Sequence, residues 1–268
     1  MISVVKIGGS LLSLGPIDHI LADFKRVLSK SRVILVHGGG KEVTEVAEKL
    51  GKKQTFIVSA SGIKSRYTDR ETMEIYSMVM AGKISTEIVA QLQSIGISAI
   101  GLSGVDACLI KAERKKRLII IDERGRKRII EGGYTGKIIS VNTEVLKMLL
   151  EAGFTPVVSP IAIGTEYEIL NVDGDRAAAY IAGFIGAENI IFLTDVSGLF
   201  LEGKLVKHLS LNEAKRIMRK VGHGMDKKIL AAVEAIELGA KRCIISSGKR
   251  EFPITYALEG EEKTVIEK

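Results

Sequence analysis

Short apolar runs rich in β-branched residues alternate along the chain with longer stretches in which apolar residues recur every three or four positions. Two of the short runs, at residues 4–7 and 33–36, each lead into a cluster of glycines, and an amphipathic stretch follows each cluster. A short apolar run is typical of a buried strand, and a period near 3.6 is typical of a helix. The pattern predicts strand, glycine turn and helix twice at the start of the chain.

Periodic stretches of both kinds continue to the end of the chain. The pattern predicts further helices at 70–94, 144–152, 175–185, 211–220 and 227–238, and further strands at 97–102, 154–159, 189–193 and 242–245. Because helices separate the strands, we expect a mostly parallel sheet covered on both faces, with ligands at the carboxyl ends of its strands. The predicted fold is α/β, a three-layer αβα sandwich. A soft boundary divides its one continuous sheet into a first lobe, 1–170, and a second lobe, 171–268.

Length and composition exclude several classes of protein. At 268 residues, of which 46% are apolar, the chain is large enough to bury a core of its own. Its two cysteines, Cys108 and Cys243, lie far apart without metal-type spacing, so we expect neither a disulfide nor a metal site held by the protein. No apolar run reaches membrane length and no export leader is evident. We therefore expect a soluble cytoplasmic protein.

The positive charge of the chain is concentrated in one segment. The net charge is +7, from 39 basic and 32 acidic residues, and residues 111–128 alone hold nine basic and three acidic residues. Two apolar runs flank an Arg124-Gly125 turn within this segment, which predicts a basic β-hairpin in the first lobe.

The basic hairpin is either a solvated surface or a docking surface for an acidic partner. The candidate docking cations are Arg114, Lys115, Lys116, Arg117, Arg124, Arg126, Lys127 and Arg128. Charge alone also suggests nucleic acid, but the chain has no tryptophan and only 5% aromatic residues to stack on bases. We therefore do not expect nucleic-acid binding.

The two glycine clusters predict contacts with phosphate. Glycine lets the backbone turn sharply and approach a ligand closely, and the amides that begin the next helix then point at an anion. Lys6 lies inside the first apolar run, where an unpaired ammonium group is costly to bury, so it favours an anionic partner. The common P-loop and dinucleotide-binding fingerprints are both missing from the chain. A different phosphate-binding arrangement is required.

Five short motifs occur in a fixed order along nearly the whole chain. They are Lys6-Ile7-Gly8-Gly9-Ser10, His37-Gly38-Gly39-Gly40, Asn171-Val172-Asp173-Gly174-Asp175, Thr194-Asp195-Val196-Ser197-Gly198 and Gly224-Met225-Asp226-Lys227-Lys228. Their order resembles the amino acid kinase family, and the branch most similar to the chain is that of the acetylglutamate kinases.

The resemblance implies transfer of the γ-phosphoryl group of ATP, bound with Mg²⁺, to a side-chain carboxylate. Lys6 and Lys228 would neutralise charge on the migrating group, and Asp175 would hold both ammonium groups in place. The other family residues would bind the nucleotide (Gly8, Gly9, Thr194, Asp195 and Gly198) or the acceptor (Gly39, Gly40, Arg66 and Asn171). Without the family, Lys228 also fits a solvated lysine, Asp175 a helix cap and Asn171 a turn residue.

Three features set the chain apart from acetylglutamate kinases. They are Tyr67, the loop at 133–137 and the basic hairpin. Together they resemble the branch that phosphorylates an amino acid attached to a small acidic carrier protein of the LysW type, and a basic rim would steer such a carrier. We therefore expect carrier-bound 2-aminoadipate, and with it carrier-bound glutamate, in lysine and arginine biosynthesis. The alternative is free N-acetylglutamate.

Other classes stay open on the residues alone, namely a nucleoside monophosphate kinase of the same fold and a non-catalytic amino-acid sensor. The resemblance also implies a homodimer formed across the helix at 70–94, whose apolar surface is large. Packing of that helix against its own sheet is the competing explanation.

Overall fold

The computed structural model spans residues 1–268 and describes all of them except 61, 63, 219–220 and 223. One sheet of eleven strands dominates the described residues. Its main path runs β15 (His208–Ser210), β17 (Thr264–Glu267), β16 (Arg242–Ser247), β12 (Asn189–Thr194), β1 (Ile2–Ile7), β2 (Arg32–His37), β10 (Thr155–Gly164), β6 (Ile110–Arg114) and β9 (Gly136–Val141). Two more strands, β5 (Ala99–Gly104) and β11 (Ile169–Asn171), also pair with β10.

The centre of this sheet is parallel, as the sequence predicts. β1 lies between β2 and β12 and is parallel to both, so that Lys6 is in register with Val36 on one side and Phe192 on the other. The carboxyl ends of the three strands therefore meet at one edge. Antiparallel pairing is confined to β11, β17 and β9 within this sheet.

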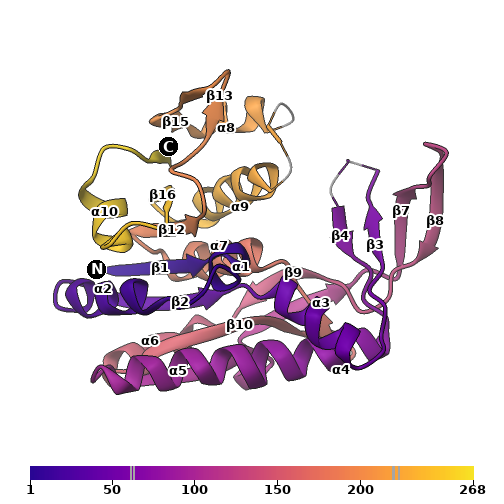
Figure 1. Cartoon of the computed structure of the whole chain (residues 1–268), viewed down its shortest axis with the longest axis horizontal. Coiled ribbons are helices and arrows are strands. Elements are labelled where there is room, and N and C mark those ends of the chain that lie inside the picture. The colour runs from indigo at the N-terminus through magenta and orange to yellow at the C-terminus, as the bar shows by residue number, and fades with distance from the viewer. Residues whose placement is uncertain (61, 63, 219–220, 223) are drawn as a thin grey trace.

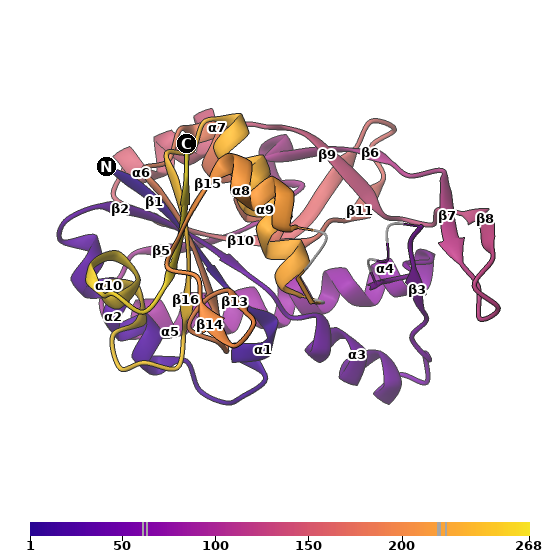
Figure 2. The same ribbon diagram turned by 90° about the horizontal axis from the view of Figure 1, so that it is seen from above.

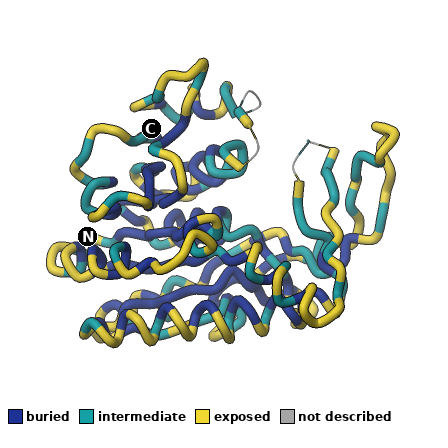
Figure 3. Tube along the Cα trace, viewed as in Figure 1, coloured by how far each residue is buried: buried dark blue, intermediate teal, exposed yellow. Residues whose placement is uncertain are grey.

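Helices cover both faces of the sheet and complete the predicted three-layer sandwich (Figures 1 and 2). One apolar cluster lies beneath α2 (Asp18–Leu28), α3 (Gly40–Lys49), α4 (Arg70–Ser77), α5 (Ser85–Ser94) and α10 (Pro253–Glu259). The other lies beneath α6 (Thr143–Glu151), α7 (Gly174–Ile185), α8 (Leu211–Ile217) and α9 (Met225–Leu238). The sheet strands between them are almost continuously buried (Figure 3). The predicted end of the helix at 211–220 falls partly on residues 219–220, outside the described residues.

The long helix predicted at 70–94 is continuous but contains a π-helical segment, Met78–Ile84, between α4 and α5. The apolar side chains that suggested a dimer interface are all buried in the chain's own core: Met73, Tyr76, Met80, Ile84, Ile88 and Leu92. Packing against the sheet therefore accounts for this apolar stripe, and the homodimer stays a prediction.

Two β-hairpins project side by side from one end of the molecule (Figure 1). The basic hairpin, β7 (Arg117–Ile121) and β8 (Lys127–Glu131), is the predicted one. The second, β3 (Phe56–Val58) and β4 (Lys64–Arg66), was not predicted from the sequence. A backbone hydrogen bond from the Ala60 amide to the Ile119 carbonyl, 3.0 Å long, joins the two hairpins. A third, short hairpin pairs β13 (Phe200–Leu201) with β14 (Lys204–Leu205).

Some features are missing from the described part of the chain. No helix there is both long and apolar enough to cross a membrane. No group of three or more His, Cys, Asp or Glu side chains is placed there to hold a metal ion. The two cysteines are not bonded to each other, since Cys108 is exposed and Cys243 is buried.

Candidate active site

Asp175 is held between two lysines that come from different parts of the fold. The Lys6 ammonium lies 2.5 Å from Oδ1 of Asp175, and the Lys228 ammonium lies 3.1 Å from Oδ2. The side chains of Lys6 and Asp175 are each only 7% exposed, and that of Lys228 is 14% exposed. The structure thus brings together the three residues that the family resemblance implies are catalytic, with both lysines in contact with the Asp175 carboxylate.

Strand alternation and close helix packing produce this arrangement. Lys6 follows Val4 by two positions in β1, so its side chain points to the same face of the sheet, the one covered by α7 and α9. Asp175 is in the first turn of α7, and Lys228 is near the start of α9. The two helices approach closely at Gly183, where a Cβ atom would lie 2.4 Å from the Cβ of Leu238.

The two ammonium groups control the charge of Asp175. Burial by itself would raise the pKa of this carboxyl, but the charges of Lys6 and Lys228 outweigh burial and lower the pKa to about 2. Asp175 is therefore ionised at neutral pH. The triad carries a net charge of +1 in a buried position, which suits an anionic ligand.

The two predicted glycine loops pack directly against each other at the carboxyl edge of β1 and β2. The amide of Gly8 donates to the Leu193 carbonyl over 3.0 Å, which ties the first loop to β12. A Cβ atom at Gly38 would lie 2.6 Å from the nitrogen of Gly9, so neither backbone leaves room for a side chain there. Gly39 has a φ of +156°, and α3 begins at the next residue without a side-chain cap. The first amides of α3 are therefore available to a ligand.

His37 holds the second glycine loop from inside the protein. Its Nδ1 lies 2.9 Å from the Gly38 carbonyl, which can only accept, so Nδ1 carries the proton. Its Nε2 lies 2.9 Å from the Ser159 hydroxyl, which can give its single proton either to Nε2 or to the Met80 carbonyl, 3.2 Å away. Burial lowers the pKa of His37 to about 4, with a smaller contribution from the charge of Lys6. His37 is therefore neutral and has a structural role.

The first of two cavities at the triad lies over the glycine loops and has a volume of about 490 Å³. Lys6, Gly39, Gly40 and Asp175 line it, together with Arg66 and Asn171. The guanidinium group of Arg66 is turned toward α3, where it donates to the Gly40 carbonyl over 2.6 Å and contacts Gln54. The side-chain amide of Asn171 donates to the hydroxyl of Thr68 over 2.9 Å.

The second cavity, about 500 Å³, lies on the other side of the triad. Lys228 lines it together with the loop that follows β12, including Thr194, Asp195 and Gly198. The Thr194 hydroxyl donates to the Asp195 carboxylate over 3.0 Å. A Cβ atom at Gly198 would lie 2.5 Å from the Thr264 hydroxyl, so the loop requires glycine at this position. Gly224 lines both cavities.

The eight candidate docking cations do not form one uniform surface. Arg114 is half-buried, donates to the Gly133 carbonyl over 2.6 Å and stacks on Tyr134. Arg126 and Arg128 pair with Asp122, and Lys116 pairs with Glu166. Three are exposed and form no ion pair with any described residue: Arg117, Arg124 and Lys127. Lys115 differs from the rest because it lines an internal cavity beneath the hairpin.

Asp173 is a functional candidate that the sequence analysis missed. Its Oδ1 accepts from the amides of Asp175 and Arg176 and so caps α7, while Oδ2 lies 3.7 Å from the Lys227 ammonium. The residue was visible only as part of a motif. Its position two residues before Asp175, at the start of a predicted helix, is the signal that indicates a cap.

Comparison with known proteins establishes the family. A model of the amino acid kinase family matches residues 1–247, so the chain belongs to the amino acid kinase family. This agrees with the fold and with a site built from glycine loops and a pair of lysines.

Two relatives are similar over nearly their whole length. A protein of Saccharolobus solfataricus named [LysW]-aminoadipate/[LysW]-glutamate kinase is 46% identical over 257 residues, 96% of each chain. A protein of Nitrosopumilus maritimus, which carries a provisional form of the same name, is 55% identical over 264 residues, 98% of each chain.

Solved structures support the fold alone, because their sequences are distant. N-acetylglutamate synthase from Neisseria gonorrhoeae is 23% identical with a TM-score of 0.81, and the match covers all of this chain and 59% of that protein. Giardia carbamate kinase is 14% identical with a TM-score of 0.72, covering all of this chain and 98% of the other.

Proposed function

We propose that the protein transfers the γ-phosphoryl group of ATP to the side-chain carboxylate of 2-aminoadipate, and of glutamate, while each is attached to a LysW-type carrier protein. The observation that carries the proposal is the joint contact of Lys6 and Lys228 with Asp175 between two cavities. The names of relatives 46% and 55% identical support the choice of substrate. The product is an acyl phosphate, which belongs to lysine biosynthesis with aminoadipate and to arginine biosynthesis with glutamate.

In the proposed reaction, an oxygen of the acceptor carboxylate forms a bond to the γ-phosphorus while the bond from that phosphorus to the β–γ bridging oxygen breaks. ADP leaves with the electron pair of that bond. Phosphoryl transfer of this kind has a loose transition state, so the protein contributes mainly by positioning and by neutralising charge. Lys6 and Lys228 supply that positive charge from opposite sides, and Asp175 keeps both ammonium groups aimed at the reaction centre.

The nucleotide occupies the cavity lined by Thr194, Asp195 and Gly198, with its phosphates directed at Gly8 and Gly9 in this proposal. The hydroxyl and carboxylate oxygens of Thr194 and Asp195 are donors of the kind that Mg²⁺ accepts. Bound with the nucleotide, Mg²⁺ would neutralise part of the phosphate charge.

The acceptor occupies the cavity over α3. Its reacting carboxylate meets the amides of Gly39 and Gly40, while Arg66 and Asn171 hold its other polar groups. Residues 1–170 then form the acceptor lobe and residues 171–268 the nucleotide lobe. We further propose that the enzyme is cytoplasmic. We also propose that it forms a homodimer, and a measurement of its molar mass in solution tests the homodimer.

The basic hairpin is the proposed docking surface for the acidic carrier. It stands beside the β3–β4 hairpin, from which Phe56 and Arg66 line the acceptor cavity (Figure 1). It presents the exposed cations Arg117, Arg124 and Lys127. Exposed charges steer an oppositely charged partner and raise its association rate more than its final affinity.

The test is a comparison of acceptors with the purified protein and ATP, in which the acyl phosphate is trapped with hydroxylamine. We expect turnover on carrier-bound aminoadipate and carrier-bound glutamate, and slow turnover on free N-acetylglutamate. Faster turnover on free N-acetylglutamate would overturn the carrier assignment and favour an acetylglutamate kinase. Turnover on uridylate alone would overturn the choice of an amino acid as acceptor.

A further inference from the structure

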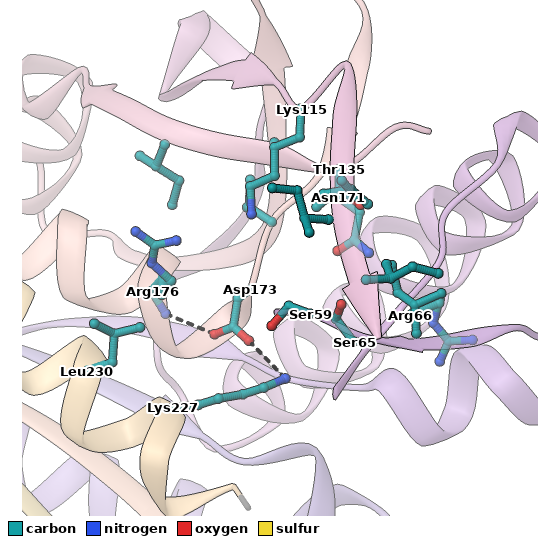
Figure 4. A pocket seen from close by; sticks show the side chains of 17 residues that line it. Ser59, Ser65, Arg66, Lys115, Thr135, Asn171, Asp173, Arg176, Lys227 and Leu230 are labelled. Atoms are coloured by element: carbon teal, nitrogen blue, oxygen red, sulfur yellow. Dashed lines mark hydrogen bonds and ion pairs between the residues drawn. The ribbon is translucent and has the colours of Figure 1, made fainter. Parts of the chain in front are cut away.

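A third cavity lies beneath the basic hairpin, next to the acceptor cavity. Its volume is about 310 Å³, and most of its wall is apolar, with side chains such as Ile57, Leu118 and Leu230 (Figure 4). It shares Asn171 and Asp173 with the acceptor cavity, so the two spaces adjoin. A mostly apolar cavity with a few convergent polar groups is typical of a ligand site.

Four cations line this cavity, and three of them have a partner. Arg66 donates to the Gly40 carbonyl over 2.6 Å. Arg176 forms a bidentate ion pair with Glu234, with contacts of 2.8 and 2.5 Å. Lys227 lies 3.7 Å from Asp173, whose other oxygen caps α7. Both acidic groups are therefore occupied, as Figure 4 shows for Asp173.

Lys115 is the fourth cation, and it has no ion-pair partner among the described residues. Its side chain extends from the segment between β6 and β7 into the cavity toward Arg176 and Asp173 (Figure 4). Burial lowers the pKa of Lys115, and the charge of Arg176 lowers it further, while Asp173 partly opposes both. Holding an unpaired ammonium group in such a place is costly unless an anion binds there.

The chemistry of the proposed substrate supplies such an anion. An amino acid joined through its amino group to the side chain of a carrier's C-terminal glutamate leaves the main-chain carboxylate of that glutamate free. A free N-acetylated amino acid has no equivalent group. With the carrier docked on the basic hairpin as proposed, the extra carboxylate lies on the hairpin side of the acceptor, where the hairpin cavity adjoins the acceptor cavity.

We propose that Lys115 binds the terminal main-chain carboxylate of the carrier and thereby selects a carrier-bound amino acid over a free one. The inference rests on the proposed function, and it adds a specific anion contact inside the protein to the general attraction of the exposed hairpin. Lys115 is thus a specificity residue, distinct from the exposed cations around it.

The first test compares Lys115→Met with Lys147→Met, a matched change at an exposed lysine of α6 that pairs with Glu144. A charge-assisted hydrogen bond of ordinary strength corresponds to about a 10- to 100-fold change in affinity. We expect Lys115→Met to raise KM for the loaded carrier by this factor while KM for ATP and turnover on free N-acetylglutamate stay unchanged. Lys147→Met should behave as the wild type. An unchanged KM, or an equal loss on both acceptors, would overturn the proposal.

The second test changes the ligand, and its main comparison uses the wild type alone. A short peptide with the carrier's C-terminal sequence is loaded with aminoadipate and made with either a free C-terminal carboxylate or a C-terminal amide. The wild type should prefer the acid by about 10- to 100-fold, and Lys115→Met should lose that preference. Equal use of acid and amide by the wild type contradicts the role of Lys115. A wild type inactive on every carrier-bound acceptor contradicts the proposed function instead.

Discussion

Gly9 and Gly38 lie backbone against backbone, so that a Cβ atom at position 38 would stand 2.6 Å from the Gly9 nitrogen. The loop after β1 and the loop after β2 are therefore one packed unit. Under the proposed function, the relative positions of phosphate and acceptor depend on this contact.

Gly38→Ala should consequently damage activity and stability together. The added methyl group meets backbone atoms, which have no alternative rotamer, and overpacking of this kind costs about 1–3 kcal/mol. Gly82→Ala is the matched control, since its Cβ would meet nothing within 4 Å in a helical segment. We expect kcat/KM to fall at least about tenfold for Gly38→Ala. For Gly82→Ala we expect kcat/KM to stay unchanged. Equal activities would show that the contact tolerates a methyl group.

Lys228→Met should reduce the rate of transfer far more than it weakens nucleotide binding. Removing one preorganised group that stabilises developing charge costs about 10²–10³ in kcat. Lys147→Met, on the exposed face of α6, provides a control outside the site. Steady-state kinetics with the loaded carrier measure both kcat and KM for ATP. A loss seen in KM for ATP alone would assign Lys228 to binding.

Asp175→Asn should destabilise the fold, because it leaves two buried ammonium groups without their counter-ion. Breaking a buried ion pair in this way costs about 3–5 kcal/mol. Urea unfolding at pH 7 measures the change in the free energy of unfolding. The double variant Lys6→Met with Asp175→Asn should recover part of the loss, and a double variant less stable than the sum of the singles would contradict this account.

Stability should fall as the pH is lowered from 6.5 to 4 because of His37. Its pKa is depressed from 6.5 to about 4 in the folded protein, so between these values the unfolded chain binds a proton that the folded chain does not. The contribution is complete above pH 6.5, and its loss approaches about 3 kcal/mol near pH 4. Asp175, with a pKa lowered to about 2, contributes only below about pH 4.

Urea unfolding between pH 4.5 and 7.5 measures the effect of His37, and His37→Gln should flatten the slope. NMR of the imidazole nitrogens gives an independent measurement on the wild type. Protonation of His37 at pH 6 in the folded protein would refute the assignment of a neutral, Nδ1-protonated ring.

Reversing the exposed cations Arg117, Arg124 and Lys127 to glutamate should slow carrier binding without affecting ATP. The wild type should lose affinity for the carrier as salt rises, since exposed charges are screened within about 8 Å at physiological ionic strength. The variant should show a smaller salt dependence. Lys30→Glu, Lys147→Glu and Lys241→Glu together, at exposed positions away from the two projecting hairpins, make the same change in net charge. Carrier kinetics equal to wild type would identify the hairpin as a solvated surface.

The central sheet could be predicted because its strands are local patterns. The apolar run around Lys6 and the glycines that follow it carry both the strand and its end, so β1 was found with its functional turn. The basic hairpin was found for the same reason, since two β-branched runs flank Arg124-Gly125.

Contacts between distant segments could not be predicted in the same way. The hairpin of β3 and β4 is short and polar, and it depends on the bond from Ala60 to Ile119. Asp23 accepts from the amides of Ile254 and Thr255 at the start of α10, a cap from another helix that leaves no local signal. Lys115 lies within a run of surface cations, so nothing in that run indicates that this one points inward.

Because β1 lies between β2 and β12, the spacing of the reacting groups and the choice of substrate are set by different parts of this protein. Neighbouring strands are spaced by about 4.8 Å, so the loops after β2, β1 and β12 stand in a row roughly 10 Å across. That span is set by backbone pairing, whatever molecule is brought to it. The two projecting hairpins stand at the same end of the molecule, beyond this row, so insertions at their tips leave the spacing of the row unchanged (Figure 1). Changes in the hairpins can therefore adapt the protein to a different substrate while the distance over which the phosphoryl group is transferred stays the same.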